Sequence, residues 1–250
     1  MALVEARFQA KHLGKMSSLY VLLPEGAGPF PVLYLLHGLS DDHTGWIRRT
    51  SVERYMDNVP MIVVMPDGHR SFYINDGRPG GNPYEDHIIK DVVGFVDETF
   101  RTIPQRQARA VAGLSMGGYG SMMLALRHPD LFSVACSHSG ALAAFHRPCP
   151  ELPLLQELTS AIEPGQYDCF ALAAKRKESS AGELAIRFDC GDKDFLLQDS
   201  QDFHAHLEKL GIAHSYTEFP GDHNWDYWDL HIQDTIGFIR QNLPALRQGD

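Results

Sequence analysis

Short apolar runs alternate with helical patterns along most of the chain, and this alternation constrains the fold more than any other feature. Eight apolar or alternating runs stand out, at 4–10, 17–23, 32–37, 61–65, 109–113, 133–137, 184–189 and 214–219. The middle runs, such as VLYLLH at 32–37 and MIVVM at 61–65, are almost continuously apolar. Such runs are typical of parallel strands that are buried on both faces.

Helical spacing is visible between these runs. Within 85–100, Ile88, Val92, Val96 and Phe100 recur every three or four residues and form one apolar stripe. Further helices are expected over 117–128, 198–210 and 227–242. Strands that alternate with helices predict one α/β domain over residues 1–250, with a mostly parallel eight-stranded sheet and helices on both faces.

The stretch VAGLSMGGYG at 111–120 places a serine between glycines at the end of an apolar run. Gly113-x-Ser115-x-Gly117, followed by a helical pattern, gives the strand, turn and helix of a nucleophile elbow. Glycine suits both flanks because a side chain would collide with the neighbouring strand or helix. The alternative is a turn serine or a helix N-cap. We predict that Ser115 is a nucleophile.

A serine hydroxyl needs an adjacent base, usually an oriented histidine. In α/β-hydrolases the chain order is Ser, then Asp or Glu, then His. His128 ends the helix after the elbow, where capping is the expected role. His223, in FPGDHNWDYW, follows the last strand on a loop at the carboxyl edge of the sheet. We therefore predict His223 as the base, the alternative being an exposed loop histidine.

The carboxylate that orients this histidine should follow the preceding strand, which ends in FDCGDKDFLL. Asp189 falls within the strand, whereas Asp192 and Asp194 share the loop after it. Spacing alone leaves the choice between the two loop residues open. Asp222 is a poor candidate because adjacent loop side chains tend to diverge from one another.

An oxyanion hole needs two preorganised N–H donors. One is expected from Met116, directly after the nucleophile, and the other from the loop HGLSDD after the strand at 32–37. Leu39 is placed to give its backbone N–H, with Gly38 allowing close approach. The alternative for this loop is an ordinary turn at the end of a strand.

Charge and composition disfavour several classes of partner. The formal net charge of −10 disfavours nucleic acid and anionic membranes. No apolar run approaches the roughly 18 residues of a membrane span, and the first residues lack a secretory pattern, so we expect a cytoplasmic protein. No metal is expected, because the histidine spacings match no zinc pattern. No organic cofactor is expected either, because a reaction at an activated serine does not require one. The cysteines show no C-x-x-C pairing and are expected to be reduced thiols: Cys136, Cys149, Cys169 and Cys190.

Together these motifs resemble the esterase D-like branch of the α/β-hydrolases, and within it the small cytosolic tributyrin or acetyl esterases of bacteria. The resemblance covers nearly the whole chain and rests on VLYLLHGLSDDHTGW, YEDHIIKDVVGFVDETF, VAGLSMGGYGSMMLALRHPDLF, CGDKDFLL and PGDHNWDYW. It implies that the catalytic aspartate lies in Gly-x-x-Asp-Phe-Leu, which selects Asp194. It also implies Leu39 and Met116 as the oxyanion donors.

The resemblance implies a serine carboxylesterase that hydrolyses short-chain acyl esters of small molecules. Trp46 and Trp225 lie near the motifs and are candidates for a substrate pocket, although packing is the alternative role. The long, proline-interrupted segment 141–180 is expected to form a small cap over the site.

Three alternatives to the carboxylesterase remain. One is an S-formylglutathione or other thioester hydrolase, whose family carries Gly-His-Ser-Met-Gly-Gly-His-Gly where this chain has GLSMGGYG. Another is an acetyl or feruloyl carbohydrate esterase. The third is a catalytically silent binding module on the same fold. Whether the protein forms a homo-oligomer is left open.

Overall fold

One eight-stranded sheet organises the computed structural model, which describes residues 1–148, 152–178 and 182–247. The strand order is β1-β2-β4-β3-β5-β6-β7-β8. The pairs β1–β2 and β2–β4 are antiparallel and the remaining neighbours are parallel, which confirms the mostly parallel sheet. The strands are β1 (Ala2–Ala10), β2 (Lys15–Leu23), β3 (Val32–Leu36), β4 (Ile62–Pro66), β5 (Arg109–Leu114), β6 (Val134–His138), β7 (Ala185–Gly191) and β8 (Ser215–Phe219).

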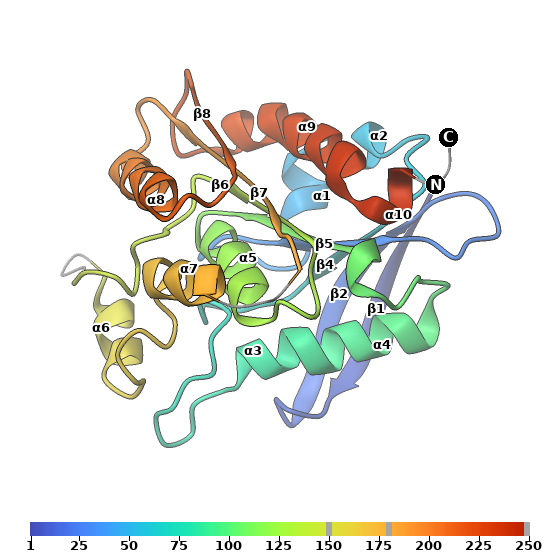
Figure 1. Cartoon of the computed structure of the whole chain (residues 1–250). Helices are drawn as coiled ribbons and strands as arrows, with labels where there is room; N and C mark the ends of the chain where they lie inside the picture. Colours follow the sequence, from blue (N-terminus) through green and yellow to red (C-terminus); the bar gives the residue numbers. More distant parts are fainter. Residues whose placement is uncertain (149–151, 179–181, 248–250) are drawn as a thin grey trace.

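Helices cover both faces of this sheet (Figure 1). One face carries α1 (Gly45–Arg49), α2 (Val52–Tyr55), α9 (Trp225–Asn242) and the short α10 (Pro244–Arg247). The other carries α3 (Tyr84–Asp86), α4 (Val93–Thr99), α5 (Met116–Arg127), α7 (Cys169–Glu178) and α8 (Leu197–Leu210). The short helix α6 (Pro153–Thr159) adds Leu155 and Leu158 to the apolar core on this second face, and a 3-10 turn lies at Arg106–Ala108. Every strand and long helix expected from the sequence is present, with ends shifted by one or two residues.

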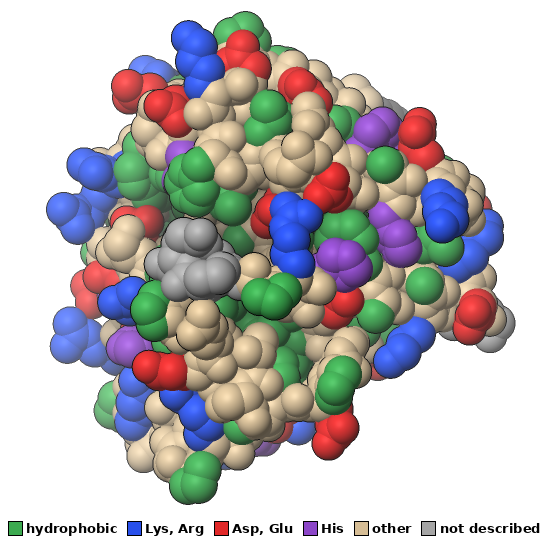
Figure 2. All heavy atoms as spheres, turned by 90° about the vertical axis from the view of Figure 1, so that its left-hand side faces the viewer, with side chains coloured by type: hydrophobic (Ala, Val, Ile, Leu, Met, Phe, Trp, Pro, Cys, Tyr) green, Lys and Arg blue, Asp and Glu red, His purple; other side chains and the backbone are tan. Residues whose placement is uncertain are grey.

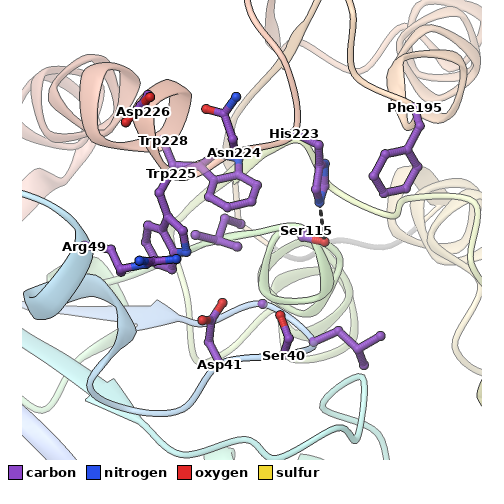
Figure 3. Close-up of a pocket in the computed structure, with 13 residues that line it drawn as sticks. Ser40, Asp41, Arg49, Ser115, Phe195, His223, Asn224, Trp225, Asp226 and Trp228 are labelled. Atoms are coloured by element: carbon purple, nitrogen blue, oxygen red, sulfur yellow. Dashed lines mark hydrogen bonds between the residues drawn. The ribbon is translucent and has the colours of Figure 1, made fainter.

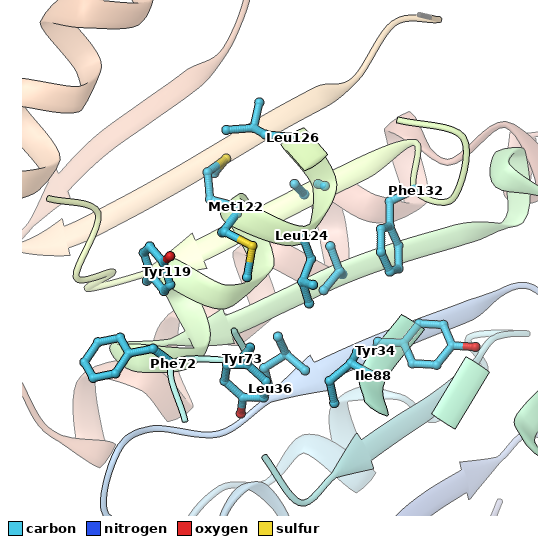
Figure 4. Close-up of a cluster of buried hydrophobic side chains, with 14 of the residues drawn as sticks. Tyr34, Leu36, Phe72, Tyr73, Ile88, Tyr119, Met122, Leu124, Leu126 and Phe132 are labelled. Carbon is cyan, nitrogen blue, oxygen red and sulfur yellow. The ribbon is translucent and has the colours of Figure 1, made fainter. Parts of the chain in front are cut away.

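The sheet separates two apolar layers because successive side chains of a strand point to opposite faces. On β3, Tyr34 and Leu36 pack towards α5, and Leu33 and Leu35 pack towards α9. All four side chains are fully buried. Figure 4 shows α5 lying over the first of these layers, with Met122 and Leu124 above β3. The central strands and α5 therefore form a rigid base for the residues that follow β5.

The helix expected over 85–100 is interrupted by a π-helical segment, His87–Val92, between α3 and α4. This segment carries a buried polar cluster. The two ring nitrogens of His87 lie 3.2 Å from an Asp91 carboxylate oxygen and 3.1 Å from the Ser17 hydroxyl. Asp91 also lies 2.7 Å from the His12 ring, so the cluster fastens this helix to the β1–β2 hairpin. Apolar spacing does not report such a widened turn, because the apolar stripe continues through it.

The segment 141–180 connects β6 to β7 and contains α6 and α7. Tyr167 anchors it to the rest of the fold, since its carbonyl accepts a hydrogen bond from the Tyr119 hydroxyl at 2.7 Å. None of its described residues lines the main cavity at the carboxyl edge of the sheet. The role of this segment as a cap therefore stays a prediction.

Candidate active site

Ser115 sits on a strained turn between β5 and α5. Its backbone has φ 53° and ψ −116°, a conformation that non-glycine residues rarely adopt. The flanking glycines are required by close backbone packing. A Cβ on Gly113 would lie 2.4 Å from the Gly117 carbonyl oxygen, and one on Gly117 would lie 2.5 Å from the Leu36 carbonyl oxygen. The sequence thus folds here into the elbow that its glycine spacing indicates.

His223 and Asp194 converge on this serine from two other loops. His223 lies between β8 and α9, and its Nε2 is 3.0 Å from the Ser115 hydroxyl oxygen (Figure 3). Its Nδ1 is 2.9 Å from one Asp194 carboxylate oxygen and 3.0 Å from the other. The imidazole is therefore held between a hydroxyl and a carboxylate, with Nδ1–H directed at Asp194 and Nε2 free to accept a proton.

The other aspartates considered from the sequence have different partners. Asp189 is fully buried in β7 and accepts hydrogen bonds from the Tyr227 hydroxyl and the His138 ring. The Asp192 carboxylate turns back to accept the Gly221 N–H at 3.0 Å. Asp222 accepts the backbone N–H of His223, not its ring. Among these candidates, only Asp194 contacts the His223 imidazole.

Asp194 is ionised although its side chain is completely buried. Burial alone would raise the pKa of this carboxyl group. The neighbouring groups outweigh burial and hold the pKa of Asp194 below its ordinary value. His223 lowers this pKa by hydrogen bonding and by its charge, and the Leu196 N–H and Ser139 lower it further. A buried negative charge thus lies next to Nδ1 of His223, where it stabilises an imidazolium ion.

Two backbone N–H groups beside Ser115 are unused. No acceptor in the described part of the chain takes a hydrogen bond from the N–H of Leu39 or of Met116. Met116 is the first residue of α5, and N–H groups in the first turn of a helix have no intrahelical acceptor. Leu39 lines the same cavity as Ser115. These are the two donors that the sequence motifs indicate.

His37 fixes the peptide that carries the Leu39 N–H. The Gly68 N–H donates to Nε2 of His37 at 2.8 Å, so the ring proton is on Nδ1. Nδ1 in turn donates to the Gly38 carbonyl oxygen at 2.7 Å. That oxygen and the Leu39 N–H belong to one planar peptide and point in opposite directions. Holding the carbonyl therefore also sets the direction of the N–H.

A cavity of about 590 Å³ opens above Ser115, within the size range of small-molecule sites. Trp225 and Trp228 line one wall. Trp46 does not reach the cavity: it is 1% exposed, its indole N–H donates to the Leu36 carbonyl oxygen, and its ring packs edge-on against Trp225. The expected substrate contact of Trp46 is therefore wrong, because a fully buried side chain supports the pocket from behind.

Sequence reasoning missed several lining residues. Phe195 is 75% exposed, and its ring centroid lies 4.4 Å from that of His223. Arg49 at the end of α1 and Asp41 in the loop after β3 line the cavity on the side away from Phe195 (Figure 3). The adjacency of Phe195 to Asp194 was an available signal. Arg49 gave none: it closely follows the motif that ends at Trp46, but nothing in the residue pattern indicates that α1 brings it to the cavity.

The wider face around the cavity is chemically mixed. The carboxyl ends of the parallel strands point to this face, and Figure 2 shows acidic, basic, histidine and hydrophobic side chains interspersed over it. Within the described residues, no group of three or more histidines, cysteines or acidic residues is arranged to hold a metal ion. Among the same residues, no helix is long and apolar enough to cross a bilayer.

The three cysteines that the structure describes do not line the cavity. Cys136, Cys169 and Cys190 are buried free thiols, and Cys149 lies outside the described residues. Burial raises the pKa of Cys136 and of Cys190 to about 12. Both groups are therefore protonated and unreactive near neutral pH.

The elbow, the strand order and the three converging side chains are those of an α/β-hydrolase. Comparison with known proteins places the chain more narrowly, because the family model described as "Putative esterase" matches residues 10–239. The chain belongs to this esterase family, in its esterase D-like branch, and is a serine hydrolase of carboxylic esters.

Three relatives illustrate the range of the family. An acetyl esterase of Caldicellulosiruptor saccharolyticus is 26% identical, covering 96% of this chain and 98% of its own length. The structure of an S-formylglutathione hydrolase from Staphylococcus aureus superposes with a TM-score of 0.84 at 30% identity, covering 95% of this chain and 98% of that one. A ferulic acid esterase gives a TM-score of 0.84 at 27% identity, with coverage of 97% and 98%.

Proposed function

We propose that this protein is a carboxylesterase that hydrolyses short-chain acyl esters through Ser115, His223 and Asp194. The observation that carries the proposal is the continuous contact from hydroxyl to imidazole to buried carboxylate, at 3.0 Å and 2.9 Å. Such a chain activates a serine that would otherwise be a weak nucleophile.

In the proposed reaction, Ser115 Oγ attacks the ester carbonyl carbon while His223 Nε2 takes the hydroxyl proton. The negative charge that develops on the carbonyl oxygen is stabilised by the N–H groups of Leu39 and Met116. The tetrahedral intermediate expels the alcohol, which His223 protonates. Water, activated by the same histidine, then hydrolyses the acyl-enzyme and regenerates Ser115. No step requires a cofactor.

The short acyl preference rests on two supports. One relative that matches over nearly its whole length is an acetyl esterase. The cavity above Ser115 also has a volume of about 590 Å³, which is room for a small acyl group and its alcohol. The cytoplasmic location expected from the sequence stays a prediction.

S-Formylglutathione hydrolysis is the second candidate, favoured by the likeness to the staphylococcal enzyme at 30% identity. The second histidine of that family's motif is replaced here by Tyr119, which is fully buried and donates to the Tyr167 carbonyl oxygen. Position 119 thus packs the segment after β6 and does not line the cavity. The first histidine of the motif is replaced by Leu114, which does line the cavity, and this departure makes the simple ester the first choice.

Two measurements test the proposal. Ser115→Ala is expected to lower kcat for p-nitrophenyl acetate by about 10⁴-fold or more while the protein stays folded. Across p-nitrophenyl esters from C2 to C12, kcat/KM should be highest at the short end. A maximum at C10 or longer would reject the acyl preference, and near wild-type turnover by Ser115→Ala would reject the mechanism. Parallel assays with S-formylglutathione, acetylated sugars and feruloyl esters separate the alternatives.

A further inference from the structure

The loop that follows β4 packs behind the oxyanion loop without entering the catalytic cavity. We call residues 67–74 the β4 loop. Its side chains Phe72 and Tyr73 are buried, and neither lines the cavity. Figure 4 shows both beneath α5, with Tyr73 beside Leu36 of β3. The two side chains can therefore influence the site only through the residues that they and their backbone contact.

Two groups of the β4 loop bind His37. The Tyr73 hydroxyl donates to the His37 carbonyl oxygen at 3.0 Å, and the Gly68 N–H donates to Nε2 of the His37 ring at 2.8 Å. The same ring holds the next peptide through the Gly38 carbonyl oxygen. Two consecutive carbonyl groups are therefore fixed, and the second belongs to the planar peptide that carries the Leu39 N–H.

The β4 loop also contacts the residue that carries the second expected donor. The Phe72 N–H donates to Sδ of Met116 at 3.4 Å. Met116 is 1% exposed and is the first residue of α5. One loop thus contacts both sides of the expected oxyanion hole, the first through His37 and the second through Met116.

The backbone of the β4 loop is strained. His69, Phe72 and Tyr73 have φ angles of +48°, +52° and +57°, in the left-handed region that bulky side chains rarely adopt. Such strain persists only where the surroundings hold it, and it clusters at functional sites. Ser71 is one restraint, because its hydroxyl donates to the Gly68 carbonyl oxygen at 2.6 Å and accepts the Tyr73 N–H at 3.0 Å.

The ring of Tyr73 is packed between two glycines. A Cβ on Gly68 would lie 2.2 Å from Cε1 of this ring, and one on Gly120 in α5 would lie 2.4 Å from Cδ2. Tyr73 is also fully buried. The ring therefore has no room to rotate away, and its hydroxyl stays directed at the His37 carbonyl oxygen.

We propose that Tyr73 is a positioning residue for the oxyanion hole, whose hydroxyl fixes the peptide between His37 and Gly38 and so directs the Leu39 N–H. This inference rests on the proposed function of the site. Tyr73 touches neither the substrate nor the reacting atoms. Because the negative charge develops only in the transition state, loss of the Tyr73 hydroxyl should lower kcat and leave KM unchanged.

Tyr73→Phe tests the proposal, because it removes the hydroxyl and keeps the ring. With p-nitrophenyl acetate we expect kcat to fall about tenfold at constant KM, less than the 10²- to 10³-fold that loss of a whole donor costs. A methyl trifluoromethyl ketone gives a second readout. Its carbonyl carbon bonds to Ser115 Oγ, the hydroxyl proton passes to His223, and the carbonyl oxygen becomes an oxyanion. Its inhibition constant should rise by the factor by which kcat falls.

Tyr119→Phe is the matched control. Tyr119 is fully buried, and its hydroxyl also donates to a backbone carbonyl oxygen, that of Tyr167, at 2.7 Å. This carbonyl belongs to the segment after β6 and not to the oxyanion loop. Tyr119→Phe should therefore lower Tm about as much as Tyr73→Phe does, but with the kcat and the ketone affinity of the wild type.

A second variant acts on the β4 loop without changing Tyr73. Ser71→Ala removes the two hydrogen bonds that restrain the loop. We expect a smaller fall in kcat, about two- to fivefold, again at constant KM, because the Tyr73 hydroxyl is still present but held less firmly.

Wild-type kcat and ketone affinity in a folded Tyr73→Phe protein would overturn the inference, and so would equal losses of kcat in Tyr73→Phe and Tyr119→Phe. If Tyr73→Phe did not fold, wild-type kinetics of Ser71→Ala would overturn it instead. An inactive Ser115→Ala protein measured alongside would show in each case that the proposed function still holds.

Discussion

The side chain of His37 fixes the orientation of the peptide between Gly38 and Leu39, whose N–H is the expected oxyanion donor. His37 is 1% exposed, and both of its ring nitrogens bind backbone: Nδ1 donates to the Gly38 carbonyl oxygen and Nε2 accepts from the Gly68 N–H, while the Asp67 carboxylate lies 3.6 Å from Nε2. Because the Leu39 N–H is expected to stabilise the oxyanion, the effect of His37 should appear in the transition state and not in substrate binding.

We expect His37→Leu to lower kcat for p-nitrophenyl acetate by about ten- to a hundredfold with little change in KM, since loss of an oxyanion donor costs about 10²- to 10³-fold. His37→Asn should lose less, because its amide N–H₂ lies near the position of Nδ1. Steady-state kinetics of both variants check this. Equal losses in the two variants, accompanied by equal falls in Tm, would instead indicate a packing role.

Only some of the individual site residues could be predicted from the sequence. Ser115, His223 and the Leu39 loop could be located because each follows a recognisable strand. Spacing left Asp192 and Asp194 equivalent, since both follow β7. Their difference depends on where each carboxylate turns: Asp192 binds the Gly221 N–H, and Asp194 binds His223. The role of His37 was invisible because its partner Gly68 lies in the loop after β4.

The helix α5 approaches the end of β3 so closely at Gly117 that no side chain fits at this position. A Cβ on Gly117 would lie 2.5 Å from the Leu36 carbonyl oxygen and 2.6 Å from that of His37, and backbone atoms cannot move aside as a flexible side chain can. By contrast, Gly94 in α4 has nothing within 4 Å of a built Cβ. The close packing of α5 on β3 therefore requires glycine at position 117, whereas no neighbouring atom requires glycine at position 94.

We expect Gly117→Ala to lower the free energy of unfolding by about 1–3 kcal/mol, as overpacking does. Gly94→Ala should raise the same quantity by about 0.5–1 kcal/mol, because alanine loses less backbone entropy in a helix. Urea unfolding of both variants at one temperature measures the pair. If the free energy of unfolding of Gly117→Ala equalled that of the wild type, α5 would have to move away from β3 at no cost.

Strands and helices were predictable because their apolar periods are local. The central strands are buried on both faces, so their continuous apolar runs identified them directly. The π-helical segment His87–Val92 was not predictable, since it coincides with a buried cluster that joins Asp91 to His12, 79 residues away. Interactions of this range leave no periodic trace in the sequence.

At the scale of the molecule, the buried polar clusters join segments that the sheet does not hydrogen-bond together. Glu85 in α3 is one centre. Its carboxylate lies 2.7 Å from Arg127 Nε at the end of α5, 2.7 Å from His128 Nε2 and 2.8 Å from the Tyr167 hydroxyl. His128 is the C-cap residue of α5, as the sequence suggested, and its ring also pairs with Glu85. A single carboxylate connects three parts of the chain.

This cluster predicts how stability depends on pH. Burial would raise the pKa of Glu85, but hydrogen bonds from His128, Arg127 and Tyr167 lower it from an ordinary 4.5 to about 2. A depressed pKa in the folded state stabilises the protein above pH 4.5, and this contribution is lost as the pH falls from 4.5 to 2. The shift corresponds to about 3 kcal/mol.

Glu85→Gln should therefore reduce the free energy of unfolding by up to about 3 kcal/mol at pH 7, and by much less near pH 3, where the wild type has lost most of the same contribution. Urea unfolding between pH 7 and pH 3 measures the difference. Glu98→Gln in α4 is the control, because Glu98 is exposed and its curve should follow that of the wild type. If the free energies of unfolding of Glu85→Gln and the wild type differed by the same amount at every pH, the cluster would not determine how stability is lost at low pH.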